Sequence, residues 1–347
     1  MGLKGEHVVR TVGIALDGMA PIHEMIDLAR QADAARVDSL WVAEHIGYRD
    51  GLASTMALLT ATDNLTVAPV ATSIYTRHPM ITAMTAATLA EYAPGRVILT
   101  MATGNPRAHA REMGLSLERP VAVMREYVQV LRGLWSGDPV TFSGEFFRLD
   151  DATFYVVPRQ RLPVFVAGIG PRMLELAGEL GDGAVFSAGL SPVAIRHCIE
   201  LVRLGAARAG RDAQMVKTVA ILITAVAKDS GRARRQARAF FAYALRNRFI
   251  AENVKLTGTP IDIRAAAAAA AHGDWDAAAA LIPDDALDDY AIAGTREECA
   301  AQLKRFLVEG LDVPVLLPVG DAEGRQEAVK LAGWACQEAR GAGGHAQ

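Results

Sequence analysis

Short apolar runs alternate with longer amphipathic patterns along this chain. The apolar runs are rich in Val, Ile and Leu, which is typical of strands buried on both faces of a parallel sheet. We predict eight such strands, at residues 8–16, 39–43, 65–71, 96–102, 164–167, 184–187, 216–224 and 313–317. We predict helices at residues 22–35, 52–62, 80–92, 121–135, 173–180, 192–209, 231–248 and 296–309, with a further helical pattern at 326–339. Strands and helices that alternate in this way predict an α/β fold, the (β/α)8 TIM barrel.

Two connections are longer than a minimal barrel needs, and we interpret both as insertions. Residues 136–160, after the fourth strand, carry alternating aromatic residues around Ser143 and Gly144, which predict a surface hairpin. Residues 250–293, after the seventh strand, contain two alanine runs that predict short helices, which form either a mobile lid or a plain low-complexity insertion. We expect one barrel domain over residues 1–340 and a disordered tail at 341–347.

Composition excludes several classes of protein. The chain has 347 residues, 51% of them hydrophobic, so it can bury a large core. A formal net charge of −3 argues against a nucleic-acid or membrane-surface partner, and the sequence predicts neither a membrane span nor a signal peptide. Three dispersed cysteines, Cys198, Cys299 and Cys336, indicate a reducing compartment and predict neither a disulfide nor a metal site. We expect a cytoplasmic protein that acts on a small molecule.

A glycine-rich turn follows the predicted strand at residues 164–167. Gly168-Ile169-Gly170-Pro171 leads directly into the next helix, and such a turn leaves backbone N–H groups free at the positive end of the helix dipole. Phosphates bind at such positions. A tight turn without any ligand would have the same sequence, so both interpretations stay open at this point.

Polar side chains also follow the second strand, where Glu44 and His45 come directly after its apolar run. A barrel carries its functional residues at these strand ends. The pair could hold a ring or relay a proton, because the pKa of histidine lies near neutral pH. A salt bridge that closes the barrel is the alternative. A metal is disfavoured, since no further ligand recurs nearby at a suitable spacing.

The third and fourth strands end in polar segments as well. Pro69 lies within the third strand, where a closed barrel offers no free edge, so we predict a bulge there. The polar run at 72–79 follows, and its Arg77 is either a ligand contact or an ordinary loop cation. After the fourth strand, Thr103 and Asn105 could bond a polar ring edge, although Gly and Asn-Pro also signal a simple turn.

Four motifs together resemble the luciferase-like oxidoreductases, in particular the branch that uses the deazaflavin coenzyme F420 and includes methylenetetrahydromethanopterin reductase. They are LWVAEH at 40–45, YTRHP at 75–79, APGRVILTMATGN at 93–105 and VFVAGIGPRMLELAGELGDG at 164–183. Their order matches the family, and the resemblance covers roughly residues 8–225.

The resemblance implies a site for F420 in the barrel mouth. It places the phosphate-bearing tail near the turn of Ala167, Gly168, Ile169 and Gly170, and the ring beside Glu44 and His45, with His45 assisting proton movement. It also implies a non-proline cis peptide at Val70–Ala71, behind the ring, with Thr72 and Ser73 at the ring edge. Thr103 and Asn105 complete the predicted cofactor contacts.

The function implied is hydride transfer between F420 and a small organic substrate, such as a one-carbon pterin or folate-type carrier. Sugar-phosphate oxidation is disfavoured, because Asn105 stands where such members carry glutamate. The alternatives are a flavin mononucleotide (FMN) monooxygenase of the same fold and a non-catalytic barrel. The turn after the fifth strand lacks the serines expected of FMN users, which favours F420. Family habit implies a homodimer. The apolar helices at 80–92 and 121–135 either supply its surface or pack in the core.

Overall fold

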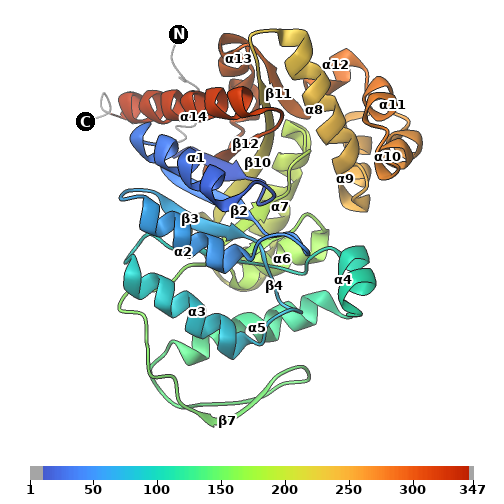
Figure 1. Ribbon diagram of the computed structural model, residues 1–347. Coiled ribbons are helices and arrows are strands. Elements are labelled where there is room, and N and C mark those ends of the chain that lie inside the picture. The colour runs from blue at the N-terminus through green and yellow to red at the C-terminus, as the bar shows by residue number, and fades with distance from the viewer. Residues whose placement is uncertain (1–10, 344–347) are drawn as a thin grey trace.

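The computed structural model describes residues 11–343 and contains the predicted (β/α)8 barrel (Figure 1). The strands are β1 (Gly13–Leu16), β2 (Ser39–Ala43), β3 (Thr66–Val70), β4 (Thr72–Ser73), β5 (Leu99–Ala102), β6 (Val140–Ser143), β7 (Arg148–Ala152), β8 (Val164–Ala167), β9 (Gly183–Phe186), β10 (Lys217–Val226), β11 (Ala291–Gly294) and β12 (Val313–Pro318). The main sheet has the order β3-β2-β1-β12-β10-β9-β8-β5-β4, and every pairing in it is parallel. A bridge between Val67 and Val97 joins its two ends and closes the barrel.

Helices surround this sheet. They are α1 (Ile22–Ala34), α2 (Gly51–Ala61), α3 (Pro79–Tyr92), α4 (Pro106–Met113), α5 (Pro120–Leu134), α6 (Pro171–Leu180), α7 (Pro192–Arg208), α8 (Ser230–Ala244), α9 (Arg248–Val254), α10 (Ile263–Ala271), α11 (Trp275–Ala280), α12 (Asp284–Leu287), α13 (Arg296–Phe306) and α14 (Ala322–Gly343), with short 3-10 turns at Ala213–Met215 and Lys255–Thr257. Most predicted helix bounds agree with these to within two residues.

The third strand position is shared by β3 and β4. β3 pairs with β2 and ends at Val70. After Ala71, which belongs to neither strand, β4 pairs with β5. A cis peptide bond joins Val70 to Ala71, at the position that the resemblance implied. The predicted bulge near Pro69 therefore takes the form of a break that passes the strand from one neighbour to the other.

Three elements differ from the sequence prediction. The segment 231–248 forms two helices instead of one, because Asn247 caps a new helix and its side chain accepts the Phe249 N–H. The turn predicted after Thr103 instead begins α4, with Asn105 as its N-cap and Pro106 in its first turn. Inside the second predicted insertion, β11 pairs with the end of β10.

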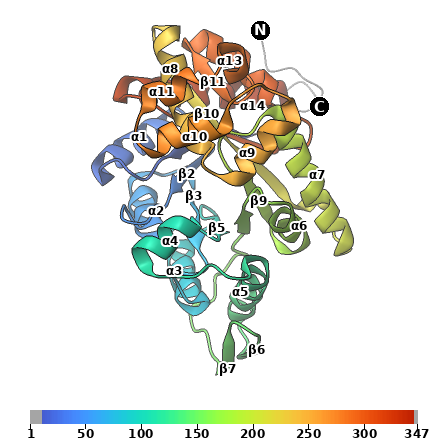
Figure 2. The ribbon, with the colours of Figure 1, turned by 90° about the vertical axis from the view of Figure 1, so that its right-hand side faces the viewer.

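The insertions extend in different directions. The predicted hairpin at 140–152 is formed by β6 and β7, and it projects away from the barrel (Figure 1). The alanine runs form α10 and α11, which pack on α8 (Figure 2). At the C-terminus, α14 continues to Gly343, so the first part of the expected disordered tail is helical. Residues 344–347, and residues 8–10 of the first predicted strand, lie outside the described residues.

Candidate functional site

Neighbouring strands carry the predicted site residues to one rim. β2, the shared position of β3 and β4, β5 and β8 follow one another around the barrel, so their C-terminal ends lie side by side. This rim carries the residues that were predicted to contact a cofactor: Glu44, Val70, Ala71, Thr72, Ser73, Thr103, Asn105, Ala167, Gly168, Ile169 and Gly170. The rim therefore brings these residues into one region, and their contacts with a cofactor stay a prediction.

Small side chains form the inner surface of this rim. The rings of Trp41 and Phe165 lie 6.2 Å apart although β2 and β8 are not adjacent, so both rings face the barrel interior. Two residues further along their strands, Ala43 and Ala167 face the same way, and both are half-buried. Ala102, at the end of β5, adds a third half-buried alanine. Together these alanines place three small, uncharged side chains at the barrel mouth, which we call the alanine floor.

Thr72 lies behind this floor. It is in register with Met101, one residue after Thr100, and Thr100 is in register with the inward-facing Phe165. Since side chains alternate along a strand, Thr72 points toward the outer helices. It is fully buried, and its hydroxyl has no partner among the described residues. The predicted contact of Thr72 with a cofactor ring stays a prediction.

Glu44 braces the segment that contains the cis peptide. Its N–H donates to the Val70 carbonyl (3.2 Å), and its carboxylate accepts the Gly51 N–H at the start of α2 (2.8 Å) and the Ser73 N–H. Burial raises the pKa of Glu44. The Gly51 and Ser73 amides lower that pKa, as does Arg77, while the Asp50 carboxylate raises it, and the net shift is upward. Glu44 therefore positions both sides of the Val70–Ala71 bond.

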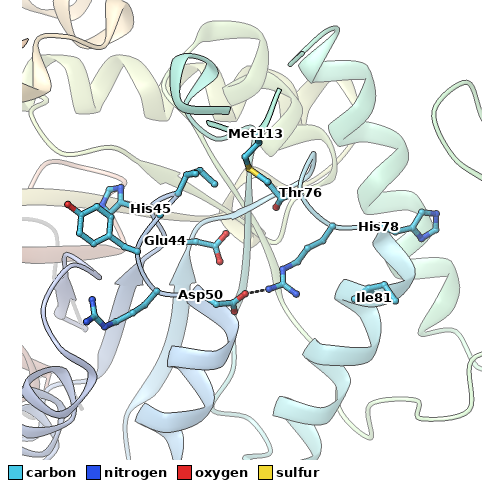
Figure 3. Close-up of a pocket in the computed structure, with 12 residues that line it drawn as sticks. Glu44, His45, Asp50, Thr76, His78, Ile81 and Met113 are labelled. Atoms are coloured by element: carbon cyan, nitrogen blue, oxygen red, sulfur yellow. Dashed lines mark hydrogen bonds and ion pairs between the residues drawn. The ribbon is translucent and has the colours of Figure 1, made fainter. Parts of the chain in front are cut away.

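His45 points away from Glu44, as Figure 3 shows. Its imidazole donates to the backbone carbonyl of Asp17, the residue that follows β1, and stacks edge-on with Tyr48. Burial lowers the pKa of His45, while the charge and backbone carbonyl of Asp17 raise it, and the net shift is downward. The imidazole is therefore mostly neutral at pH 7 and can accept a proton. Sequence reasoning missed Asp17, although it directly follows an apolar strand.

A pocket of about 480 Å³ opens between the loops after β2 and β4 (Figure 3). Glu44 and His45 line it, together with the apolar side chains of Ile81 and Met113. Across it, Arg77 forms an ion pair with Asp50, whose other carboxylate oxygen caps α2 through the Ala53 N–H. Arg77 thus has an intramolecular partner, which favours its interpretation as a loop cation.

The rim after β5 holds a histidine that sequence reasoning missed. Asn105 uses its amide oxygen to cap α4, and the Thr103 carbonyl accepts from the Ser73 hydroxyl (3.3 Å). His109 is buried beside them, with Nδ1 at 2.8 Å from the Asn105 carbonyl and Nε2 at 3.1 Å from the Ser73 hydroxyl. The Asn-Pro pair could have signalled a helix start, which would place His109 one turn after Asn105.

The glycine turn begins α6 without a side-chain cap, so the start of this helix has no side-chain acceptor of its own. A Cβ on Gly168 would lie 2.9 Å from Cγ of Met173, and one on Gly170 would lie 2.9 Å from Cζ of Phe249. A side chain at either position would therefore displace Met173 or Phe249. Phe249, from α9, covers the turn on one side, a long-range contact that local sequence patterns do not reveal.

Other kinds of site find little support in residues 11–343. They contain no group of three or more His, Cys, Asp or Glu side chains that could hold a metal. Nor is any helix in this part of the chain both long and apolar enough to cross a membrane. Cys198, Cys299 and Cys336 are free and buried.

The fold and the rim define a closed parallel (β/α)8 barrel with the alanine floor, a histidine of lowered pKa and a braced cis peptide at one side of its mouth. The chain belongs to the luciferase-like monooxygenase family, whose model matches residues 7–312.

Two curated relatives indicate the branch. The chain is 29% identical over 328 residues to the 5,10-methylenetetrahydromethanopterin reductase of Methanolobus tindarius, which covers 93% of this chain and 98% of the relative. It is 34% identical over 208 residues to the F420-dependent glucose-6-phosphate dehydrogenase of Mycolicibacterium smegmatis, covering 56% of this chain and 62% of the relative.

Solved structures agree on the fold. The coenzyme F420-dependent tetrahydromethanopterin reductase of Methanopyrus kandleri superposes with a TM-score of 0.82 at 23% identity, covering 93% of this chain and 97% of the other. An F420-dependent secondary alcohol dehydrogenase, in complex with an F420-acetone adduct, superposes with a TM-score of 0.77 at 25% identity, covering 92% and 97%. These similarities confirm the predicted luciferase-like barrel.

Proposed function

We propose that this chain is an oxidoreductase that transfers a hydride between coenzyme F420 and a small organic substrate. The observation that carries the proposal is the alanine floor, which lies beside His45 and the cis peptide Val70–Ala71. Relatives and structural neighbours named as F420-dependent enzymes support it.

The residues present fit a deazaflavin. A planar tricyclic ring needs an apolar surface without protruding side chains, and the small, half-buried Ala43, Ala102 and Ala167 would leave room for it. A phosphate-bearing tail needs free backbone N–H groups, and the uncapped start of α6 after Gly170 is close to the floor because Ala167 ends the preceding strand. Ring and tail would therefore occupy adjoining parts of one rim.

The cofactor, when bound, supplies the hydride chemistry, and the chain supplies position and proton handling. Glu44 keeps Val70 and Ser73 in place through its N–H and its carboxylate. His45 bonds Asp17 through one imidazole nitrogen, which leaves the other nitrogen able to accept or return a proton. The Ile81 and Met113 side chains line the pocket beside Glu44 and His45, where a substrate could enter.

The substrate class we favour is a one-carbon carrier of the pterin or folate type. The relative that matches over nearly its whole length is a methylenetetrahydromethanopterin reductase. Assay of F420 oxidation with methylene carriers, secondary alcohols and sugar phosphates side by side would identify the class. Activity with only an alcohol or a sugar phosphate would overturn this choice while leaving the F420 proposal intact.

Titration of the purified protein with F420 and with FMN tests the cofactor. We expect saturable quenching of F420 fluorescence, and a variant Ala167→Leu that fills the alanine floor should not bind F420. Ala152→Leu, on the outlying strand β7, is the matched control and should bind normally. Tight binding of FMN without binding of F420 would instead support a flavin monooxygenase, and binding of neither would support a non-catalytic barrel.

We also propose a homodimer formed through α3. This helix exposes Ile81, Met84 and Tyr92, while the hydroxyls of Thr85 and Thr88 bond carbonyls of their own helix. The resulting face offers few free polar groups to water, which is typical of an interface. The apolar face of α5, the other helix considered, is buried in the core. Light scattering should give a dimer for the wild type and a monomer for Met84→Glu.

A further inference from the structure

His109 is the only side chain of α4 that is buried, among the described residues of that helix. It is 2% exposed and lies against the rim, whereas the other side chains of this short helix are half-buried or exposed. Its burial in a helix that otherwise faces solvent requires an explanation beyond packing, because a buried imidazole is costly unless its nitrogens are bonded.

Both nitrogens are bonded, and their partners fix the direction of each bond. The Asn105 carbonyl can only accept, so Nδ1 carries the hydrogen (2.8 Å). In the neutral imidazole, Nε2 is then an acceptor, and the Ser73 hydroxyl donates to it (3.1 Å). The Thr103 carbonyl, at 3.3 Å, is the competing acceptor for the single hydroxyl hydrogen of Ser73. His109 therefore determines where this hydrogen points.

The loop after β5 is shaped around the histidine. Gly104 has φ +80°, and a Cβ at this position would lie 2.2 Å from Cε1 of His109. The ring thus contacts β4 through Ser73 and the β5 loop through Gly104 and Asn105. It joins the ends of β4 and β5, where Ser73 lies in register with Ala102 of the alanine floor.

We propose that His109 is a positioning residue for the cofactor, acting through Ser73 and the Thr103–Asn105 loop. The inference rests on the proposed function, because the rim it holds is the one proposed to bind F420. Without the imidazole acceptor, the Ser73 hydroxyl turns to the Thr103 carbonyl, and α4 loses its side-chain link to β4. The floor around Ala102 would then be less ordered, and F420 would bind more weakly.

A double-mutant cycle on the F420 dissociation constant tests this. His109→Leu and Ser73→Ala should each raise the constant about 10-fold, the size expected for one hydrogen bond. If His109 acts through Ser73, the double variant should also show about 10-fold, whereas independent effects would multiply to about 100-fold. His109→Gln can still accept from Ser73 and should restore binding to nearly the wild-type value.

His272 provides the matched control. Its Nδ1 also lies 2.8 Å from the carbonyl four residues earlier, that of Ala268, but it is exposed on α10. His272→Leu should leave the dissociation constant unchanged. Multiplied effects in the double variant, or wild-type binding by a folded His109→Leu, would overturn the inference.

A His109→Leu variant that does not fold and a wild type that does not bind F420 lead to different conclusions. Should His109→Leu not fold, Ser73→Ala and His109→Gln carry the test, and wild-type binding by Ser73→Ala would overturn the inference. Failure of the wild type to bind F420 would overturn the proposed function itself, which the wild-type titration shows before any variant is compared.

Discussion

Two of the glutamates that accept backbone N–H groups lie in different settings, Glu44 at the barrel rim and Glu126 beside the outlying hairpin. Glu126, on α5, accepts the N–H groups of Glu145, Phe146 and Phe147 at 2.8, 2.9 and 3.1 Å. Glu44 accepts those of Gly51 and Ser73. Both carboxylates accept backbone N–H groups, yet the pKa of Glu44 is raised and that of Glu126 is lowered.

Burial explains the difference. Burial raises the pKa of Glu126, but three amide bonds and the charge of Arg119 together outweigh it, so the net shift is downward. At Glu44 burial is the larger influence and the net shift is upward. The hairpin carboxylate is thus a stable anchor, whereas the rim carboxylate is held in an environment that disfavours its charge. Such environments are typical of functional sites, where a residue serves something other than stability.

The largest effect on F420 binding is expected when the Glu44 carboxylate is removed. Glu44→Ala removes the acceptor for the Gly51 and Ser73 amides, and the F420 dissociation constant should rise about 100-fold, the cost of two hydrogen bonds. Fluorescence titration measures it. Glu126→Ala, which removes amide bonds of the hairpin turn and not of the cis-peptide segment, is the control and should bind F420 as the wild type does. An equal rise of the F420 dissociation constant in Glu44→Ala and Glu126→Ala would show that Glu44 has no role in cofactor binding that Glu126 lacks.

The second effect concerns stability at the hairpin. Glu126→Ala leaves three amides without their charged acceptor, and the free energy of unfolding should fall by about 2 kcal/mol. Urea denaturation at neutral pH measures the loss. An unchanged midpoint would mean that water replaces the carboxylate at no cost, and Glu126 would no longer count as an anchor.

The pH dependence sharpens this result. Because the folded pKa of Glu126 is below the unfolded value of 4.5, its stabilisation is fully present above pH 4.5. It is lost as the pH falls through the lowered folded pKa. The stability difference between the wild type and Glu126→Gln should therefore be largest at neutral pH and vanish in acid. A difference that persists in acid would point to packing instead of charge.

The sequence predicted the barrel, and with the resemblance it predicted the position of the cis peptide, because these depend on local patterns and motif register. It could not predict that Glu44 and His45 point apart, since this depends on how the loop after β2 folds back over α2. The four-residue β11 was missed because Ala-Ile-Ala-Gly carries little strand preference and is stabilised by its pairing with β10.

Contacts between segments that are far apart in the chain could not be predicted from the sequence either. The bond between His109 and Ser73 depends on how α4 lies against the end of β4, and the contact of Phe249 with Gly170 depends on α9 reaching the turn before α6. Alternation along strands decides which rim residues face the interior, and the sequence alone did not show that Thr72 points outward.

The smallest expected effect, a change in stability in Glu44→Gln, tests the comparison of Glu44 with Glu126 most specifically. The folded pKa of Glu44 is above the unfolded value, so the protonated form favours folding, and this stability is present below pH 4.5 and lost as the pH rises through the folded pKa. Glu44→Gln mimics the protonated form at every pH and keeps an oxygen that can accept from Gly51. At neutral pH the variant should be more stable than the wild type, by less than about 1 kcal/mol, and below pH 4.5 the two should be equal. Denaturation curves at both pH values measure this, and the sign is opposite to that of Glu126→Gln. A destabilised Glu44→Gln at neutral pH would show that the rim carboxylate is an anchor like the one at the hairpin, because its charge would then be stabilising the fold.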